Sequence, residues 1–230
     1  MTLLLLSAFL LAGCGGPPPA PGADDVELLG PAKPEGPPEV VDPKADALAL
    51  AKATDAGARL SAALKGRLTQ AMIDGPGAAM TACSEEAQGL TAQVRGESGA
   101  RVGRASLKLR NPTNSGPDWV QAWLTANEGK PGAEAALSSE VTTTPEGRFA
   151  RVIRPITVEA GCLTCHGDPA AIPPPVKEQL TARYPQDAAT GYKVGDLRGA
   201  LWAELPVKPA VERPDPAPTT PDPVAPTQEG

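Results

Sequence analysis

Large apolar side chains recur at helical spacing early in the part of the chain that can fold. Four of them fall at steps of four, on one stripe of a helix: Leu60, Leu64, Leu68 and Met72. Asp42-Pro43 precedes them, which is typical of an N-cap followed by proline at the first helical position. The sequence DGPG at 74–77 interrupts the pattern, so we expect a helix over 43–73.

A second helix is predicted immediately after this break, over about 77–95. Its apolar face comprises Ala79, Cys83, Leu90 and Val94. Two long and nearly adjacent helices should therefore open the domain.

The pattern then changes to short alternating segments separated by turn residues. Strands are predicted over 100–109, 138–144, 147–157 and 197–205, and short helices over 118–127 and 174–184. The sequence TPEG at 144–147 is typical of a hairpin turn between two of the strands. Two helices followed by strands and inserted helices indicate the α+β class.

Composition separates the foldable part of the chain from its flanks. Most of the 28 prolines fall near the two ends of the chain. We expect a Pro/Gly-rich tether over 14–43, a folded domain over 44–206 and a disordered tail over 207–230. The net charge is −6 and no Lys/Arg cluster is present, which argues against nucleic-acid binding.

The first residues are typical of a bacterial export signal. An apolar run from Leu3 to Leu11 matches a signal-peptide core and is too short to span a membrane. It ends in LAGC, which resembles a lipobox, so cleavage after residue 13 and lipidation of Cys14 are expected; a plain secretory signal is the alternative. Either process puts the domain in the cell envelope, on the periplasmic side. Gly15 in place of an aspartate favours the outer membrane.

The segment Cys162-Leu163-Thr164-Cys165-His166 contains two of the four cysteines and the single histidine. A zinc site would need a second pair of ligands, and a thioredoxin-type pair would need a βαβ unit, which the pattern does not predict. A structural disulfide in an oxidising compartment is the alternative to haem attachment. The immediate Cys-His adjacency favours covalent haem c attachment, in which His166 becomes an axial iron ligand.

The motif does not identify the second axial ligand of the iron. Met72, Met80, Cys83 and a vacant site are the candidates, although periodicity alone favours Cys83 as a small apolar core residue over a ligand. Guanidinium groups suit the carboxylates of haem. The candidate partners are Arg101, Arg104, Arg110, Arg151 and Arg154.

Three stretches together carry a family resemblance: 100–124, 151–169 and 184–206. They resemble the Tll0287-like family, and the resemblance covers the foldable chain. It implies a PAS-like fold, in which helices flank an antiparallel sheet behind a long N-terminal helix. It also implies one c-type haem. The segment AMTACSEEA matches the region of the family's second iron ligand, so the resemblance implies iron held between His166 and Cys83.

These features predict a lipid-anchored mono-haem module that senses redox state or a gas such as NO or CO. Family members often precede a kinase or receptor output, whereas here a tail follows 206, so a separate signalling partner is expected. The alternative is a low-potential electron-transfer cytochrome of the envelope. A second alternative is a disulfide-bonded structural lipoprotein without haem. No acid/base pair or substrate motif predicts an enzyme.

Overall fold

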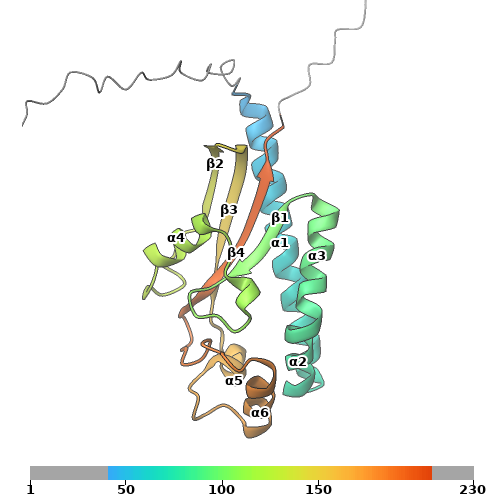
Figure 1. Ribbon diagram of the computed structural model, residues 1–230, viewed down its shortest axis with the longest axis vertical. Helices are drawn as coiled ribbons and strands as arrows, with labels where there is room; N and C mark the ends of the chain where they lie inside the picture. The colour runs from blue at the N-terminus through green and yellow to red at the C-terminus, as the bar shows by residue number, and fades with distance from the viewer. Residues whose placement is uncertain (1–40, 209–230) are drawn as a thin grey trace, which may run out of the picture. The chain divides into compact units, whose positions relative to one another are not determined.

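The computed structural model describes residues 41–208, and its centre is a four-stranded antiparallel sheet (Figure 1). The strands have the order β1-β4-β3-β2 across the sheet. Their bounds are β1 (Arg101–Ala105), β2 (Ser138–Thr144), β3 (Gly147–Thr157) and β4 (Leu197–Pro206). The predicted α+β class, with an antiparallel sheet and flanking helices, is confirmed.

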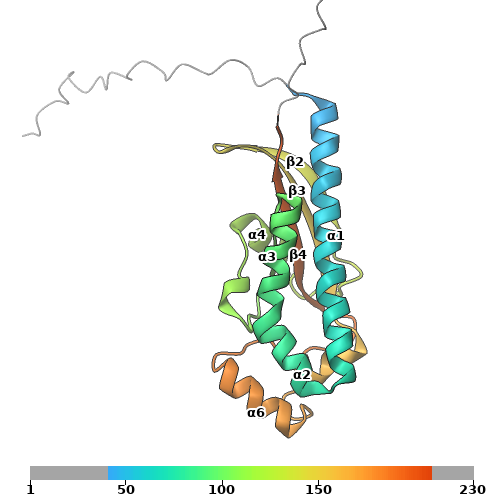
Figure 2. The same ribbon diagram turned by 90° about the vertical axis from the view of Figure 1, so that its right-hand side faces the viewer.

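Two long helices cover one face of this sheet (Figure 2). Helix α1 (Pro43–Ile73) starts where the sequence predicts, and the Asp42 carboxylate accepts a hydrogen bond from the Lys44 N–H at 2.8 Å. Small residues on its inner stripe let the helix lie close to the strands, where it packs beside α3 (Ala87–Ser98). The core between these layers includes Ala53, Ala56, Leu60, Val94, Val102, Val152 and Ala203.

A shorter helix, α4 (Asp118–Ala126), packs against the opposite face of the sheet. Its residues Val120 and Leu124 are buried against Trp202 of β4. Gly103 of β1 lies opposite Trp202 in the register, and a Cβ at Gly103 would come within 2.8 Å of the indole ring. Glycine at position 103 therefore leaves the space that the indole ring of Trp202 occupies.

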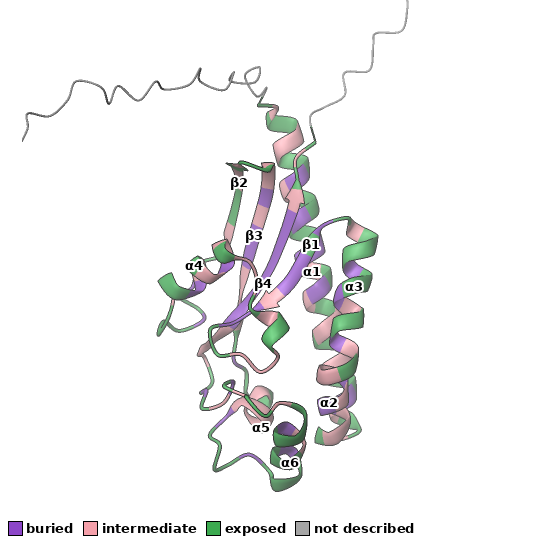
Figure 3. Cartoon of the chain, in the orientation of Figure 1, coloured by how far each residue is buried: buried purple, intermediate pink, exposed green. Residues whose placement is uncertain are grey.

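Three short helices gather beyond one end of the sheet: α2 (Pro76–Thr81), α5 (Leu163–His166) and α6 (Pro174–Arg183) (Figure 1). Met80 of α2 is buried together with Val176 and Leu180 of α6. Figure 3 shows buried positions on the strands that face the helices, whereas β2 at the sheet edge is more exposed. The segment 162–166 therefore lies within this group of three short helices, beyond the end of the sheet.

Two elements differ from the sequence prediction. The strand expected over 100–109 ends at Ala105, because the Ser106 hydroxyl donates to the carbonyls of Lys108 and Arg198 and turns the chain away. The helix expected over 77–95 begins at Pro76, reaches Ser98 and contains a π-helical turn at Ala82–Glu86.

No helix within residues 41–208 has the length and apolar character needed to cross a membrane. Cys14, the expected signal peptide, most of the expected tether and nearly all of the tail lie outside the described residues; the end of the expected tether, Asp42 and Pro43, begins α1.

Candidate functional site

The CLTCH segment folds into one short helical turn directly after the sheet. A 3₁₀ turn at Ala160–Cys162 runs into α5, and the Gly167 N–H closes the turn on the Leu163 carbonyl at 3.0 Å. Residues three and four apart share a face of such a turn, so Cys162, Cys165 and His166 are presented together. The two motif cysteines are free thiols, and all three side chains are half-buried.

His166 is held in the form that binds a metal. Its Nδ1 lies 2.7 Å from the Ala189 carbonyl, an acceptor, so the proton belongs on Nδ1 and the lone pair on Nε2. Burial first, and then the nearby charges of Arg110 and Arg198, lower the pKa of His166 to about 3. The ring is therefore neutral near pH 7, and its Nε2 lone pair faces the Nη1 of Arg110 at 3.5 Å.

Arg110 joins the motif to the loop that follows it. Its Nη2 donates to the Cys165 carbonyl at 2.5 Å and forms an ion pair with Asp187 at 2.9 Å. Its Nη1 lies 3.5 Å from His166 Nε2. The Arg110 and Asp187 side chains are only 10% and 11% exposed, so this ion pair is buried. It links the CLTCH turn, through Arg110, to the loop that contains Asp187.

Cys83 enters the site from the helices, on the π-helical turn. The Ala87 N–H reaches back five residues to the Ala82 carbonyl, which widens the turn that carries Cys83. Burial raises the pKa of the Cys83 thiol, and the charges of Arg104 and Arg110 oppose this shift. Burial also raises the pKa of Cys165; the charge of Arg110 opposes this shift and the nearby Cys83 adds to it. The structure thus brings Cys83, Arg104 and Arg110 together with the CLTCH turn.

The two methionine candidates for the second ligand position lie in different surroundings. Met80 is buried in the cluster that Cys165 and Tyr184 pack against. Met72 packs instead against a separate alanine cluster between α1 and α2. Within residues 41–208, no three or more His, Cys, Asp or Glu side chains gather into a metal-binding group, which is unlike a zinc site.

The candidate arginines separate onto the two faces of the sheet. Arg104 belongs to the site, and Arg154 lies in the same cross-strand row, since both pair with Leu201 in the register. Arg101 and Arg151 instead form ion pairs with Glu204, at 2.7 and 2.8 Å, on the face that carries α4. The structure therefore does not bring Arg101 or Arg151 together with the CLTCH turn.

The Glu204 network makes a prediction about stability. The Glu204 side chain is 3% exposed and accepts hydrogen bonds from both arginines. Glu204→Gln should lower the free energy of unfolding by about 2 kcal/mol, because two charge-assisted bonds lose their carboxylate. Arg101→Ala, at a side chain 64% exposed, should cost less than about 1 kcal/mol. Urea unfolding of both variants measures this order, and the reverse order would contradict it.

Several residues of the site have no signal in the local sequence. Asp187 and Ala189 hold Arg110 and His166 from a loop without periodicity, and the Tyr192 N–H donates to the His166 carbonyl at 3.0 Å. The only local sign in the sequence is that these three residues lie close together in the loop before the last strand. The π-helical turn around Cys83 leaves no trace in the composition.

Comparison with known proteins was made for the sequence and for the fold. The sequence model of the Tll0287-like family, described as Tll0287, matches residues 40–206. The crystal structure of the cyanobacterial heme-protein Tll0287 is similar to this chain, with 25% sequence identity and a TM-score of 0.52. The similarity covers 72% of this chain and 97% of that chain. No curated protein matches the chain.

Proposed function

Because this chain belongs to the Tll0287-like family, we propose that it is a haem-binding module. A solved relative is described as a heme-protein, and it is covered almost completely by this chain. The observation that carries the proposal is that Arg110 contacts both Cys165 and a neutral His166, while Cys83 lies near Arg104, Arg110 and Cys165. This set of residue types suits haem, which takes thiols at its edge, nitrogen or sulfur at its iron and cations at its carboxylates.

In detail, we propose one covalent haem c, with thioether bonds to Cys162 and Cys165. His166 Nε2 and the Cys83 sulfur are the proposed iron ligands. When bound, haem supplies a redox-active iron that can also take a diatomic gas. The Ala189 carbonyl orients the imidazole, and Arg104 and Arg110 supply positive charge beside Cys83.

The role we propose first is sensing of redox state or of a gas such as NO or CO. A sensor needs a ligand that can leave and an element that changes when it does. Burial raises the pKa of Cys83, so a released thiolate would take up a proton and would not return readily. The π-helical turn at Ala82–Glu86 links this event to α3, which packs against α1. The alternative is low-potential electron transfer, favoured by the half-buried motif side chains, which would leave haem near a partner.

The accessibility of Cys83 distinguishes these two roles. With haem attached, a Cys14→Ser chain retains Cys83 as its single free thiol, because the chain has four cysteines. Sensing predicts that a maleimide labels Cys83 slowly in the ferric state and about tenfold faster after dithionite or NO, in proportion to the released fraction. Cys83→Ala provides the control for background labelling. Equal protection in all states would reject sensing and favour electron transfer.

We further propose lipidation at Cys14 and a location at the periplasmic side of the cell envelope, on the outer membrane. The partner would be a separate redox or signalling protein. We assign the chain no catalytic reaction.

A further inference from the structure

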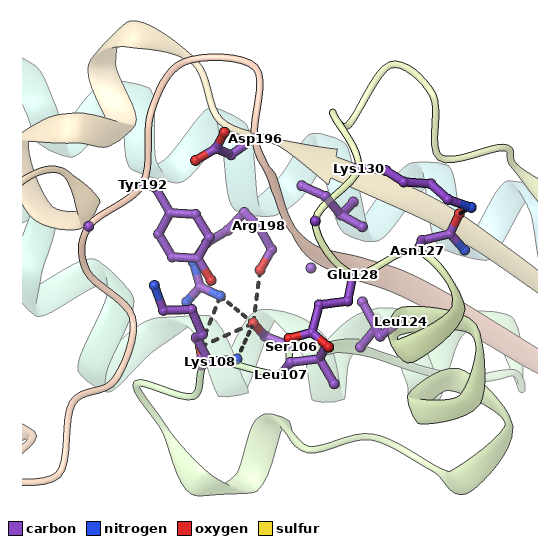
Figure 4. Close-up of a pocket in the computed structure, with 14 residues that line it drawn as sticks. Ser106, Leu107, Lys108, Leu124, Asn127, Glu128, Lys130, Tyr192, Asp196 and Arg198 are labelled. Carbon is purple, nitrogen blue, oxygen red and sulfur yellow. Dashed lines mark hydrogen bonds between the residues drawn. The ribbon is translucent and has the colours of Figure 1, made fainter.

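A cavity of about 320 Å³ lies next to Tyr192, the residue whose N–H donates to the His166 carbonyl (Figure 4). Three separate parts of the chain form its walls. They are the loop after β1, the end of α4 with the following turn, and the segment that leads into β4. Two of the lining residues, Tyr192 and Arg198, also act on His166 of the site described above.

Three cations line this cavity, and none of them has an ion-pair partner among residues 41–208. They are Lys108, Lys130 and Arg198. Lys108 Nζ donates to the Thr190 carbonyl, and Lys130 Nζ to the Asn127 side chain. The carboxylates of Glu128 and Asp196 also line the cavity, so the five side chains carry a formal charge of +1.

Arg198 is the most constrained of these cations. Its Nη1 donates to the Ser106 hydroxyl at 2.6 Å, whereas its Nε is buried without a hydrogen-bond partner. Burying a hydrogen-bond donor without a partner costs more free energy when the donor belongs to a charged group than when it belongs to a neutral one. Burial also lowers the pKa of Arg198, which an anion in the cavity would reverse.

Tyr192 connects the cations to the histidine. Lys108 Nζ lies 4.5 Å and Arg198 Cζ 5.2 Å from the centroid of its ring. On the other side, the ring meets His166 edge to face at 6.4 Å between centroids. Lys108 of the cavity is therefore separated from the imidazole by one aromatic ring.

We propose that this cavity binds a carboxylate group, held by Lys108 and Arg198. Two cations that have no ion-pair partner within residues 41–208 are suited to an anion, and a guanidinium matches the planar shape of a carboxylate. Leu107, Leu124 and Leu197 provide apolar wall for a short aliphatic chain. The carboxylate can come from a free aliphatic acid or from a haem propionate; the second source rests on the proposed function, and the first does not.

The test uses the full chain, produced with the haem c maturation system, as wild type, Lys108→Met and Arg198→Gln. Lys52→Met is the matched control, because Lys52 is an exposed lysine on α1 that does not line the cavity. Each protein is melted with increasing sodium propionate at constant ionic strength, set with sodium chloride. Its reduction potential is then measured without propionate. Lys108 is exposed, so Lys108→Met should fold even if Arg198→Gln does not.

A free-acid site predicts that propionate at tenfold excess over its Kd raises the Tm of wild type and Lys52→Met by about 3–5 °C. Lys108→Met should lose this response. A propionate site predicts no response to added acid, but a lower potential in Lys108→Met than in Lys52→Met, because a cation near the iron is lost. Equal melting and equal potentials in these two variants would overturn the proposal. If no haem is attached, the proposed function fails while the melting experiment still decides for or against the free-acid site.

Discussion

Replacing Cys162 and Cys165 together by serine should yield a folded chain without covalent haem. In the proposed site each thiol forms one thioether bond to the haem edge, and a serine hydroxyl cannot replace it. Both side chains are half-buried, so the substitutions should lower the free energy of unfolding by only about 1 kcal/mol. The expected change is from one haem per chain to none.

Intact mass after denaturation measures this result directly, since only covalent haem remains with the polypeptide. Cys83→Ser is the matched control, because it removes a thiol from the site while leaving the attachment pair in place. It should keep the full haem mass. Haem retained by the double variant after denaturation would contradict the role of Cys162 and Cys165.

Replacing Cys83 by alanine should keep the haem and raise its reduction potential. A thiolate places negative charge on the iron and stabilises the ferric form, so its loss favours reduction. Axial ligands tune haem potentials over about 0.8 V, and we expect a rise on the order of 0.1 V or more. Spectroelectrochemical titration of the variant and the wild type measures this rise.

Met80→Leu separates the candidate ligands, because it changes a buried side chain of the cluster against which Cys165 packs while conserving volume. Its potential should stay near that of the wild type. A methionine ligand would instead give the opposite result, with a lower potential in Met80→Leu and an unchanged one in Cys83→Ala. Met72 belongs to a different cluster, so Met72→Leu should have no effect on the potential.

Local patterns in the sequence predict the elements of this fold well. The stripe from Leu60 to Met72 and the Asp42-Pro43 start define α1, and TPEG lies at the turn between β2 and β3. These features depend on periodicity and turn chemistry, which act over a few residues. The early end of β1 depends on a hydrogen bond from Ser106 to Arg198, 92 residues away, and no local pattern contains it.

The alternation of side chains along a strand could have narrowed the list of candidate arginines from the sequence alone. Residues three apart on a strand point to opposite faces, so Arg101 and Arg104 cannot both reach one haem site, and the same holds for Arg151 and Arg154. Which face carries the site depends on where the helices pack, and that is a tertiary property. The Arg110–Asp187 ion pair joins residues 77 positions apart, so it follows from the fold alone.

The π-helical turn is the feature of the candidate site that sequence reasoning could not supply. A regular helix over 77–95 would place Cys83 on the same face as Leu90 and Val94. The extra residue in the turn changes this phase: Val94 is buried against the sheet, and Cys83 lies near the charges of Arg104 and Arg110. Such turns are often found at functional sites, in agreement with the ligand role proposed for Cys83.

The most direct test of the central claim is the optical and EPR spectrum of the ferric wild-type chain, produced with the haem c maturation system. One covalent haem between His166 and Cys83 predicts a low-spin ferric signature with a thiolate ligand, which Cys83→Ala removes. A purified chain without haem absorption and with the mass of the bare polypeptide would contradict the account. It would leave the alternative of a structural lipoprotein with a Cys162–Cys165 disulfide.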